Sequence, residues 1–335
     1  MGKLYMAPME QLTGFIFRNT LEEMFGGVDA YYSPFITAVA KRVMKTKEQK
    51  DVDPNNNKKV VLIPQIMAGS VEQFSEVADT LLNLGYTQIN LNAGCPSSTV
   101  VAKGKGSGLL RDPDALDRFL EGAFEHLRKK EEESGSPISL SVKTRIGMEK
   151  PWEWEDIAKV YNRYPISQLI IHPRYREQFY KGSPDMEVFS EAYKSCKQSI
   201  VYNGDIFSVE DYVRVMDTYP DLDGVMIGRG AIRNPAIFRQ IRFTCAGGSE
   251  GNGTGKEKIT GKELREYHDR LYRLYCEDMG NPKDVVYKMK EMWTYMGSLF
   301  EDSERPVREI MKSKTPEEYV ARVRSLFYAC DLKDR

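Results

Sequence analysis

Cys95 lies at the end of an apolar/polar alternation, in a position where a thiol could take part in chemistry. Residues 89–96 read Ile-Asn-Leu-Asn-Ala-Gly-Cys-Pro, which predicts a short strand that ends at a tight loop with Cys95 at its tip. A lone cysteine is most often a small buried hydrophobic residue, but a loop position on a rigid scaffold more often carries function. We therefore take Cys95 as a candidate catalytic residue.

The chain that follows this turn is rich in glycine and basic. Lys103, Lys105 and Arg111 lie in it, and no acidic residue occurs between Cys95 and Asp112. Such a segment could contact phosphate groups or close over a site.

Polar residues stand at or just past the ends of six short aliphatic runs: Gln65, Asn92, Lys143, His172, Asn203 and Arg229. Each one alone has an ordinary explanation, such as a hydrogen bond to loop backbone or an ion pair. If the runs are parallel strands of one barrel, however, their carboxyl ends share the face that carries the site. We therefore predict that these side chains surround a common site.

The elements that must position these residues alternate regularly. Predicted strands cover 3–7, 30–32, 60–63, 88–92, 138–143, 168–172, 199–203 and 223–227. Predicted helices cover 15–25, 70–84, 113–130, 153–164, 185–196 and 208–219, with Ser70 and Asp112 as N-caps. Eight strand–helix units over roughly 240 residues predict an α/β fold of the (β/α)8 TIM-barrel type. A doubly wound open sheet is the alternative.

Residues 228–230, Gly-Arg-Gly, follow the last predicted strand and suit an anion. Two glycines let the backbone approach closely, and Arg229 adds a planar cation. Gly204 and Asp205 could add backbone donors from the neighbouring strand. Because the fingerprint Gly-x-Gly-x-x-Gly is missing after the first strand, a mononucleotide such as FMN fits better than a dinucleotide. A sugar-phosphate substrate is the alternative.

The C-terminal part of the chain follows a different pattern. Residues 244–259 are rich in glycine and predict a flexible linker. Thr260, with Glu263 three residues later, predicts the start of a helix, and helical patterns continue over 285–300 and 316–327. We therefore predict a barrel domain over 1–243, a linker over 244–259 and a small all-helical domain over 260–335.

Composition bounds the class of protein. The chain has 335 residues, 41% hydrophobic and 29% charged, with a formal net charge of -1, which is typical of a globular protein. The sequence contains no long apolar run, so we expect neither a membrane helix nor a signal peptide. Three His and five Cys without ligand or disulfide spacing predict no metal site and a reducing cytoplasm. Basic residues also cluster at Lys41, Arg42, Lys45 and Lys47, a grouping that is more often a solvated face.

Taken together, the motifs resemble those of the tRNA-dihydrouridine synthases, flavin enzymes that reduce uridine in tRNA. They run in the family's order: Ala7-Pro8-Met9-Glu10 with Phe17-Arg18, Gln65 with Gly69, Asn92-Ala93-Gly94-Cys95-Pro96, Val142-Lys143-Thr144-Arg145-Ile146-Gly147, His172 with Arg174, Asn203-Gly204-Asp205, and Met226-Ile227-Gly228-Arg229-Gly230. The helical tail resembles the family's RNA-binding domain. Within the family, residues 95–100 and 288–295 are most similar to the bacterial C-type. The chain departs from the family at Pro173 and Tyr175, which leaves the shape of that loop open.

The resemblance implies a role for each matched position. Pro8, Met9 and Glu10 would border the isoalloxazine ring of FMN, and Gln65, Lys143 and His172 would contact the ring or the ribityl chain. Asn203, Gly204, Asp205, Gly228 and Arg229 would hold the phosphate end. Asn92, Lys103, Arg145 and Arg174 would contact the uridine or the RNA.

The resemblance also implies the reaction. NADPH would reduce FMN, hydride would pass from N5 of FMN to C6 of a D-loop uridine, and Cys95 would give a proton to C5. We expect a monomer whose partner is tRNA.

Three other interpretations remain open at this point. The chain could be an FMN barrel that acts on a free pyrimidine, although the helical tail and the basic loop beside Cys95 argue against it. It could be a catalytically silent RNA-binding or scaffold protein, but such a chain has no need to keep Cys95, Lys143 and Arg229. It could be an isomerase or aldolase that uses Lys143 as a Schiff base, in which case the Cys-Pro loop has no role.

Overall fold

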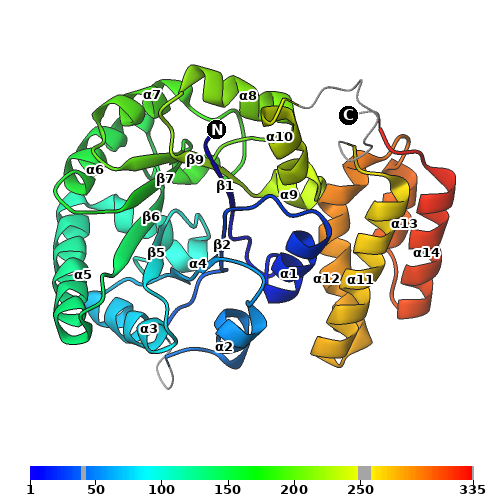
Figure 1. Cartoon of the computed structure of the whole chain (residues 1–335), viewed down its shortest axis with the longest axis horizontal. Coiled ribbons are helices and arrows are strands. Elements are labelled where there is room, and N and C mark those ends of the chain that lie inside the picture. Colours follow the sequence, from blue (N-terminus) through cyan, green and yellow to red (C-terminus); the bar gives the residue numbers. More distant parts are fainter. Residues whose placement is uncertain (39–42, 248–257, 334–335) are drawn as a thin grey trace.

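A barrel of parallel strands forms the centre of the computed structural model (Figure 1), which describes residues 1–38, 43–247 and 258–333. Its sheet order is β3-β2-β1-β9-β8-β7-β6-β5-β4. Every neighbouring pair within it is parallel. The strands among these residues are β1 (Lys3–Met6), β2 (Ala30–Tyr32), β3 (Leu62–Ile63), β4 (Gln65–Ile66), β5 (Gln88–Ala93), β6 (Ser139–Arg145), β7 (Gln168–His172), β8 (Ser199–Tyr202) and β9 (Gly224–Ile227).

The two ends of this sheet meet at Pro64, which separates β3 from β4. Proline has no N–H to give to a neighbouring strand, so the ladder is interrupted there. The Pro64 carbonyl still accepts a hydrogen bond from the Asn90 N–H at 2.9 Å, and Ile36 forms an isolated parallel bridge with Ile66. β3 and β4 therefore occupy one position of a nearly closed eight-position barrel. The predicted (β/α)8 barrel is confirmed, and the open-sheet alternative is wrong.

Helices surround the barrel, with α5 to α8 along one side (Figure 1). Two predicted caps are confirmed, because the Ser70 side chain accepts from the Gln73 N–H and Asp112 accepts from the N–H groups of Asp114 and Ala115. The helices of this part are α1 (Phe15–Met24), α2 (Thr46–Val52), α3 (Val71–Asn83), α4 (Ser98–Val101), α5 (Pro113–Ser134), α6 (Trp154–Tyr161), α7 (Met186–Ser195), α8 (Val209–Thr218), α9 (Arg229–Arg233) and α10 (Ile237–Cys245).

Four further helices form a bundle beside the barrel, next to α1 and α9 (Figure 1). They are α11 (Gly261–Met279), α12 (Pro282–Met296), α13 (Glu304–Met311) and α14 (Pro316–Ala329). The predicted capping box between Thr260 and Glu263 is present, whereas α13 was not predicted. Tyr267 joins the bundle to the barrel, because its ring makes edge contacts with Phe17 and Phe25. Most of the predicted linker (248–257) lies outside the described residues, as do Lys41 and Arg42, so the division into two domains stays a prediction.

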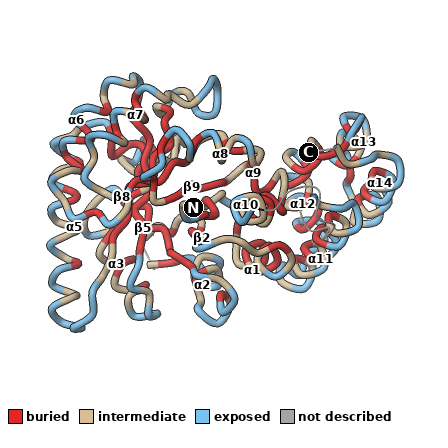
Figure 2. Tube along the Cα trace, turned by 45° about the horizontal axis from the view of Figure 1, so that its top comes forward, coloured by how far each residue is buried: buried red, intermediate tan, exposed pale blue. Residues whose placement is uncertain are grey.

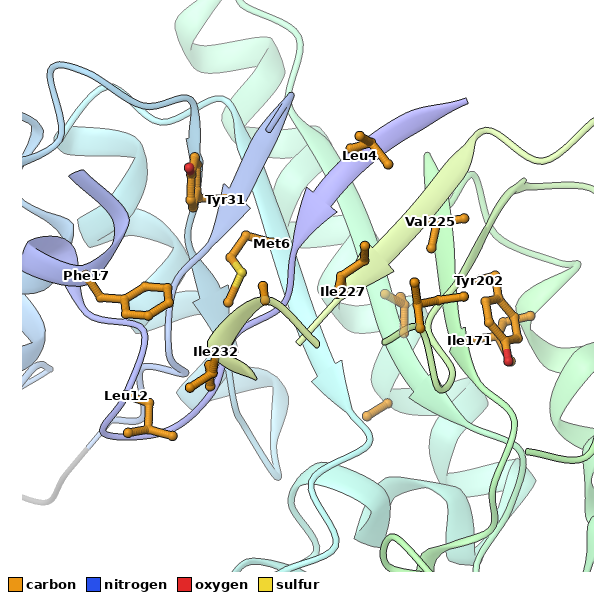
Figure 3. Packing of buried hydrophobic residues seen from close by; sticks show 14 of the residues in the cluster. Leu4, Met6, Leu12, Phe17, Tyr31, Ile171, Tyr202, Val225, Ile227 and Ile232 are labelled. Carbon is orange, nitrogen blue, oxygen red and sulfur yellow. The ribbon is translucent and has the colours of Figure 1, made fainter. Parts of the chain in front are cut away.

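Side chains alternate between the two faces of the barrel wall. Leu4 and Met6 of β1 pack outward into the main apolar cluster (Figure 3), whereas Tyr5 belongs to a separate, smaller cluster that includes Tyr32, Ile170, Val201 and Met226. Buried residues concentrate on the strands and exposed ones on the outer helices (Figure 2). On β5 and β6 the alternation places polar side chains opposite the outward-packing aliphatic ones: Asn90, Asn92, Ser141 and Lys143. One side of the barrel interior is therefore polar.

The close pairing of β1 with β9 predicts a sensitive position at Gly224. A Cβ atom added there would overlap the carbonyl oxygen of Lys3, the residue opposite it in the ladder. We expect Gly224→Ala to lower the free energy of unfolding by about 1–3 kcal/mol, because backbone must move to admit the methyl group. Gly261→Ala is the control, since nothing lies within 4 Å of a Cβ added there. Equal melting temperatures for the two variants would contradict the prediction.

Candidate active site

A cavity of about 160 Å³ lies at the carboxyl ends of the strands. Its wall combines the loop after β1 with the ends of β4 to β7 and parts of the loops that follow β2, β5 and β7. The residues that line it are Pro8, Met9, Glu10, Pro34, Phe35, Gln65, Asn92, Gly94, Cys95, Pro96, Lys143, Arg145, His172 and Tyr180. A parallel barrel places its functional side chains at this end.

The loop that carries Cys95 is fixed from three sides. The Asn92 Oδ1 atom accepts hydrogen bonds from the N–H groups of Gly94 and Cys95, at 3.0 and 2.9 Å. The Cys95 carbonyl accepts from the N–H and the hydroxyl of Ser107, at 3.1 and 2.9 Å. Arg145 Nε donates to the Gly94 carbonyl at 3.0 Å. Cys95 therefore lines the cavity from a loop whose backbone is held by several hydrogen bonds.

The environment of Cys95 keeps its thiol protonated. Burial raises the pKa of Cys95 above its ordinary value, and the opposing effects of the Ser97 backbone and of the cations Arg145 and Lys143 do not cancel that shift. Loss of solvent disfavours the thiolate, which is the charged form. At neutral pH Cys95 is thus a group that can give a proton.

Two cationic residues from β6 lie beside the thiol. Burial, with Arg145 as a second cause, lowers the pKa of Lys143 to about 7, so its amine is close to half protonated at neutral pH. Burial also lowers the pKa of Arg145 to about 10, which leaves the guanidinium charged. Arg145 donates to the carbonyls of Tyr175 and Phe179, at 3.1 and 2.8 Å, as well as to Gly94. It thereby ties the Cys95 loop to the loop after β7.

His172 is a neutral imidazole in this arrangement. Its pKa is lowered well below the ordinary value, first by burial and then by Arg145, Lys143, Arg174 and Arg229. Its Nε2 atom lies 3.1 Å from Nη1 of Arg174. A guanidinium only donates, so Nε2 accepts and the ring proton is on Nδ1.

Asp205 lies between two arginines. Its carboxylate takes a two-pronged ion pair from Arg174, at 2.9 and 2.6 Å, and accepts from Arg229 at 2.5 Å. The ring of Tyr180 covers the Arg229 guanidinium, with 4.3 Å between the Arg229 Cζ atom and the ring centroid. Because the Arg174 and Arg229 guanidinium groups share the single Asp205 carboxylate, these three side chains together carry a net positive charge. Arg174 is fully buried.

The structure brings together nine of the predicted site residues on the cavity wall: Pro8, Met9, Glu10, Gln65, Asn92, Cys95, Lys143, Arg145 and His172. Those outside the lining are Lys103, Arg174, Asn203, Gly204, Asp205, Gly228 and Arg229. Asn203 uses its amide for a hydrogen bond to the Met226 carbonyl at 2.7 Å. The roles of all these residues stay predictions.

Sequence reasoning missed two aromatic residues of the wall, Phe35 and Tyr180. Phe35 follows Ser33-Pro34, directly after the end of β2 at Tyr32, and this strand end is a signal that could have found it. Tyr180 has no such signal, because it reaches the cavity only through the path of the loop after His172. That path depends on the contacts of Arg145 and on the positive φ of 50° at Phe179.

Within 1–38, 43–247 and 258–333, no group of His, Cys, Asp and Glu side chains could hold a metal ion. Within the same ranges, no helix has both the length and the apolar character needed to cross a bilayer.

A family model and individual relatives of this chain point to the same protein family. The family model described as "Dihydrouridine synthase (Dus)" matches residues 5–329. A probable tRNA-dihydrouridine synthase of Staphylococcus aureus (strain COL) is 30% identical over 290 residues, which cover 82% of this chain and 78% of that protein. One from Helicobacter pylori (strain ATCC 700392 / 26695) is 30% identical over 297 residues, which cover 87% and 82%.

Solved structures with the same barrel have little sequence in common with this chain. Morphinone reductase in complex with tetrahydroNAD superposes with a TM-score of 0.51 at 12% identity, over 79% of this chain and 93% of that one. The old yellow enzyme from Trypanosoma cruzi gives 0.51 at 11% identity, over 72% and 88%. At these identities the likeness concerns the fold alone.

The raised pKa of Cys95 predicts a pH profile for its alkylation. Only the thiolate reacts with iodoacetamide, so the rate should rise with pH and reach half its maximum above the midpoint of free cysteine under the same conditions. Peptide mass spectrometry would separate Cys95 from the other four cysteines. A midpoint below that of free cysteine would mean that Lys143 and Arg145 outweigh burial.

Proposed function

The chain belongs to the dihydrouridine synthase family, and is therefore a flavin-dependent oxidoreductase that acts on uridine; from this premise we propose that it reduces the C5–C6 double bond of a D-loop uridine in tRNA, with FMN as cofactor and NADPH as reductant. The observation that carries the proposal is the placement of Cys95. Its protonated thiol shares one cavity with Lys143, Arg145 and the neutral His172. We further propose the bacterial C-type as its branch and a monomer as its working form.

The residues present fit FMN. Pro8 and Met9 contribute apolar lining to the cavity, and Gln65, Lys143 and His172 contribute polar lining. Lys143 is partly buried, and no carboxylate of the described residues is among the causes of its pKa shift, so it suits an anionic or electron-rich group. When bound, FMN would supply the hydride that C6 of the uracil receives.

The phosphate end of FMN would lie toward Arg229. Gly204 and Gly228 add no side chain of their own here, and Arg229 supplies a cation held by Asp205. Asp205 would repel a phosphate directly, so we propose that its part is to orient Arg229 through their ion pair. Asn203 would act in the same indirect way, by holding the end of β8 against β9.

Cys95 would donate the proton that C5 of the uracil needs. Negative charge develops on the uracil oxygens as C6 is reduced, and a thiol within reach of C5 removes it by protonation. Lys143 and Arg145 would stabilise that charge before the proton arrives. Asn92 and Arg145 hold the Cys95 loop in place, which fits the predicted contact of these residues with the uridine.

The uridine must leave its stack in the folded tRNA to reach the cavity, which costs a few kcal/mol. We propose that the loop carrying Lys103 and the helices α11 to α14 offset this cost through contacts with the phosphates and the shape of the RNA. Arg174 is buried and paired with Asp205, so its part would be to support Arg229 and His172 rather than to meet RNA.

The proton-donor role predicts the behaviour of Cys95→Ala. We expect this variant to bind FMN normally and to form dihydrouridine in unmodified tRNA about 100- to 10,000-fold more slowly, the usual range for loss of a general acid. Mass spectrometry of digested tRNA measures the product, and Cys245→Ala, at an exposed cysteine, is the matched control. Unchanged turnover by Cys95→Ala would remove Cys95 from the chemistry. Product from free uridine but not from tRNA would remove tRNA as the substrate.

The proposed phosphate contact predicts that Arg229→Met weakens FMN binding but leaves riboflavin binding nearly unchanged. A lost charge-assisted hydrogen bond of roughly 1.5–3 kcal/mol corresponds to about a 10- to 150-fold higher Kd for FMN. Flavin fluorescence gives both constants, and Arg214→Met, at an exposed arginine of α8, serves as the control. An equal loss for FMN and riboflavin would place the phosphate elsewhere.

A further inference from the structure

A line of hydrogen-bonded side chains runs through the barrel interior beneath the cavity. It begins at the Cys95 N–H, which donates to Asn92 Oδ1, and continues through Gln65 and Asn90 to Ser141. The links are Asn92 Nδ2 to Gln65 Oε1 at 2.7 Å, Gln65 Nε2 to Asn90 Oδ1 at 2.7 Å, Asn90 Nδ2 to Ser141 Oγ at 2.8 Å and Ser141 Oγ to the Ile89 carbonyl at 3.3 Å. The line thus joins β4, β5 and β6.

The direction of every bond in this line is set at its upper end. Backbone N–H groups only donate, so the Asn92 atom that meets Gly94 and Cys95 must be its oxygen. Asn92 therefore donates from its NH₂ group to Gln65, and the accepting atom of Gln65 must be its side-chain oxygen. The Gln65 NH₂ group then faces Asn90, and the acceptor there is the Asn90 oxygen.

Asn90 itself is out of reach of any substrate. It is fully buried and does not line the cavity, whereas Gln65 and Asn92, which it supports, both do. The partners of its side chain are Gln65 above and Ser141 below. Any effect of Asn90 on chemistry must therefore pass through the orientation of its neighbours.

We propose that Asn90 is a positioning residue of the active site, which holds the Gln65 amide in place by accepting from its NH₂ group and thereby supports, through Gln65 and Asn92, the placement of the Cys95 loop. The proposal rests on the function proposed above for that loop. In this proposal the reaction also depends on Asn90, a residue that contacts neither the cofactor nor the RNA.

Two substitutions at Asn90 separate orientation from packing. Asn90→Leu keeps the approximate shape but gives Gln65 no acceptor, so the Gln65 NH₂ group loses its partner in the barrel interior. Asn90→Asp keeps an acceptor for Gln65, and the Ser141 hydroxyl can turn to donate to the new carboxylate. Leu91→Val is the matched control, because Leu91 is the next residue on β5 and packs outward into the apolar cluster.

The test compares Cys95 alkylation by iodoacetamide, without tRNA or reductant, and steady-state dihydrouridine formation. For Asn90→Leu we expect alkylation of Cys95 at least about threefold faster, because the loop opens more often. We expect kcat to fall roughly 10- to 100-fold, with the KM for tRNA within about twofold, because a displaced thiol loses alignment. Asn90→Asp should recover most of both values, and Leu91→Val should lower Tm without changing either.

The proposal is overturned if Asn90→Leu and Leu91→Val behave alike, or if Asn90→Asp is as impaired as Asn90→Leu. If Asn90→Leu does not fold, Ser141→Ala tests the lower end of the line and should shift alkylation in the same direction by a smaller factor; no shift overturns the proposal. Because alkylation needs no substrate, the two proposals fail separately. If the alkylation rates of the variants rank as expected but the wild-type protein forms no dihydrouridine, the positioning role of Asn90 is upheld and the proposed function is refuted.

Discussion

The carboxamide oxygen of Asn92 accepts the N–H groups of both Gly94 and Cys95, and the geometry of the site depends on that pair of hydrogen bonds. They lie directly after the end of β5 at Ala93 and hold the backbone of a residue that lines the cavity. Because both donors are backbone groups, they also orient the Asn92 amide and, through it, the amides of Gln65 and Asn90. The Cys95 loop is thereby tied to side chains of the barrel strands β5 and β6.

Charge is arranged around this loop by burial. Lys143, Arg145 and His172 all lose solvent at the cavity wall, and burial is the first cause of the lowered pKa of each. The same loss of solvent raises the pKa of Cys95. The cavity thus holds a proton donor beside groups that favour negative charge, which is the combination that reduction of an electron-poor double bond followed by protonation requires. Asp205 keeps the neighbouring arginines ordered without neutralising both.

The barrel and its polar mouth could be predicted from sequence because their signals are local. Short aliphatic runs closed by polar residues mark the strands, and parallel pairing brings Gln65, Asn92, Lys143 and His172 to one end. The partners of Arg174 could not be predicted, since Asp205 lies 31 residues away in the chain and only the fold shows that the guanidinium is buried. The place of Tyr180 and the line through Asn90 depend in the same way on contacts between distant segments. The short helix α13 was missed because it spans only eight residues, among which Ile310 is the one buried side chain.

The central claim is that this cavity passes reducing equivalents to uridine within tRNA, and a single turnover tests it most directly. The holoenzyme carrying reduced FMN would be mixed under anaerobic conditions with unmodified tRNA, while flavin absorbance is followed and the dihydrouridine content is then measured. The account predicts that flavin absorbance recovers and that one dihydrouridine forms for each flavin reoxidised. Recovery with a free pyrimidine or a small enone, and none with tRNA, would contradict it.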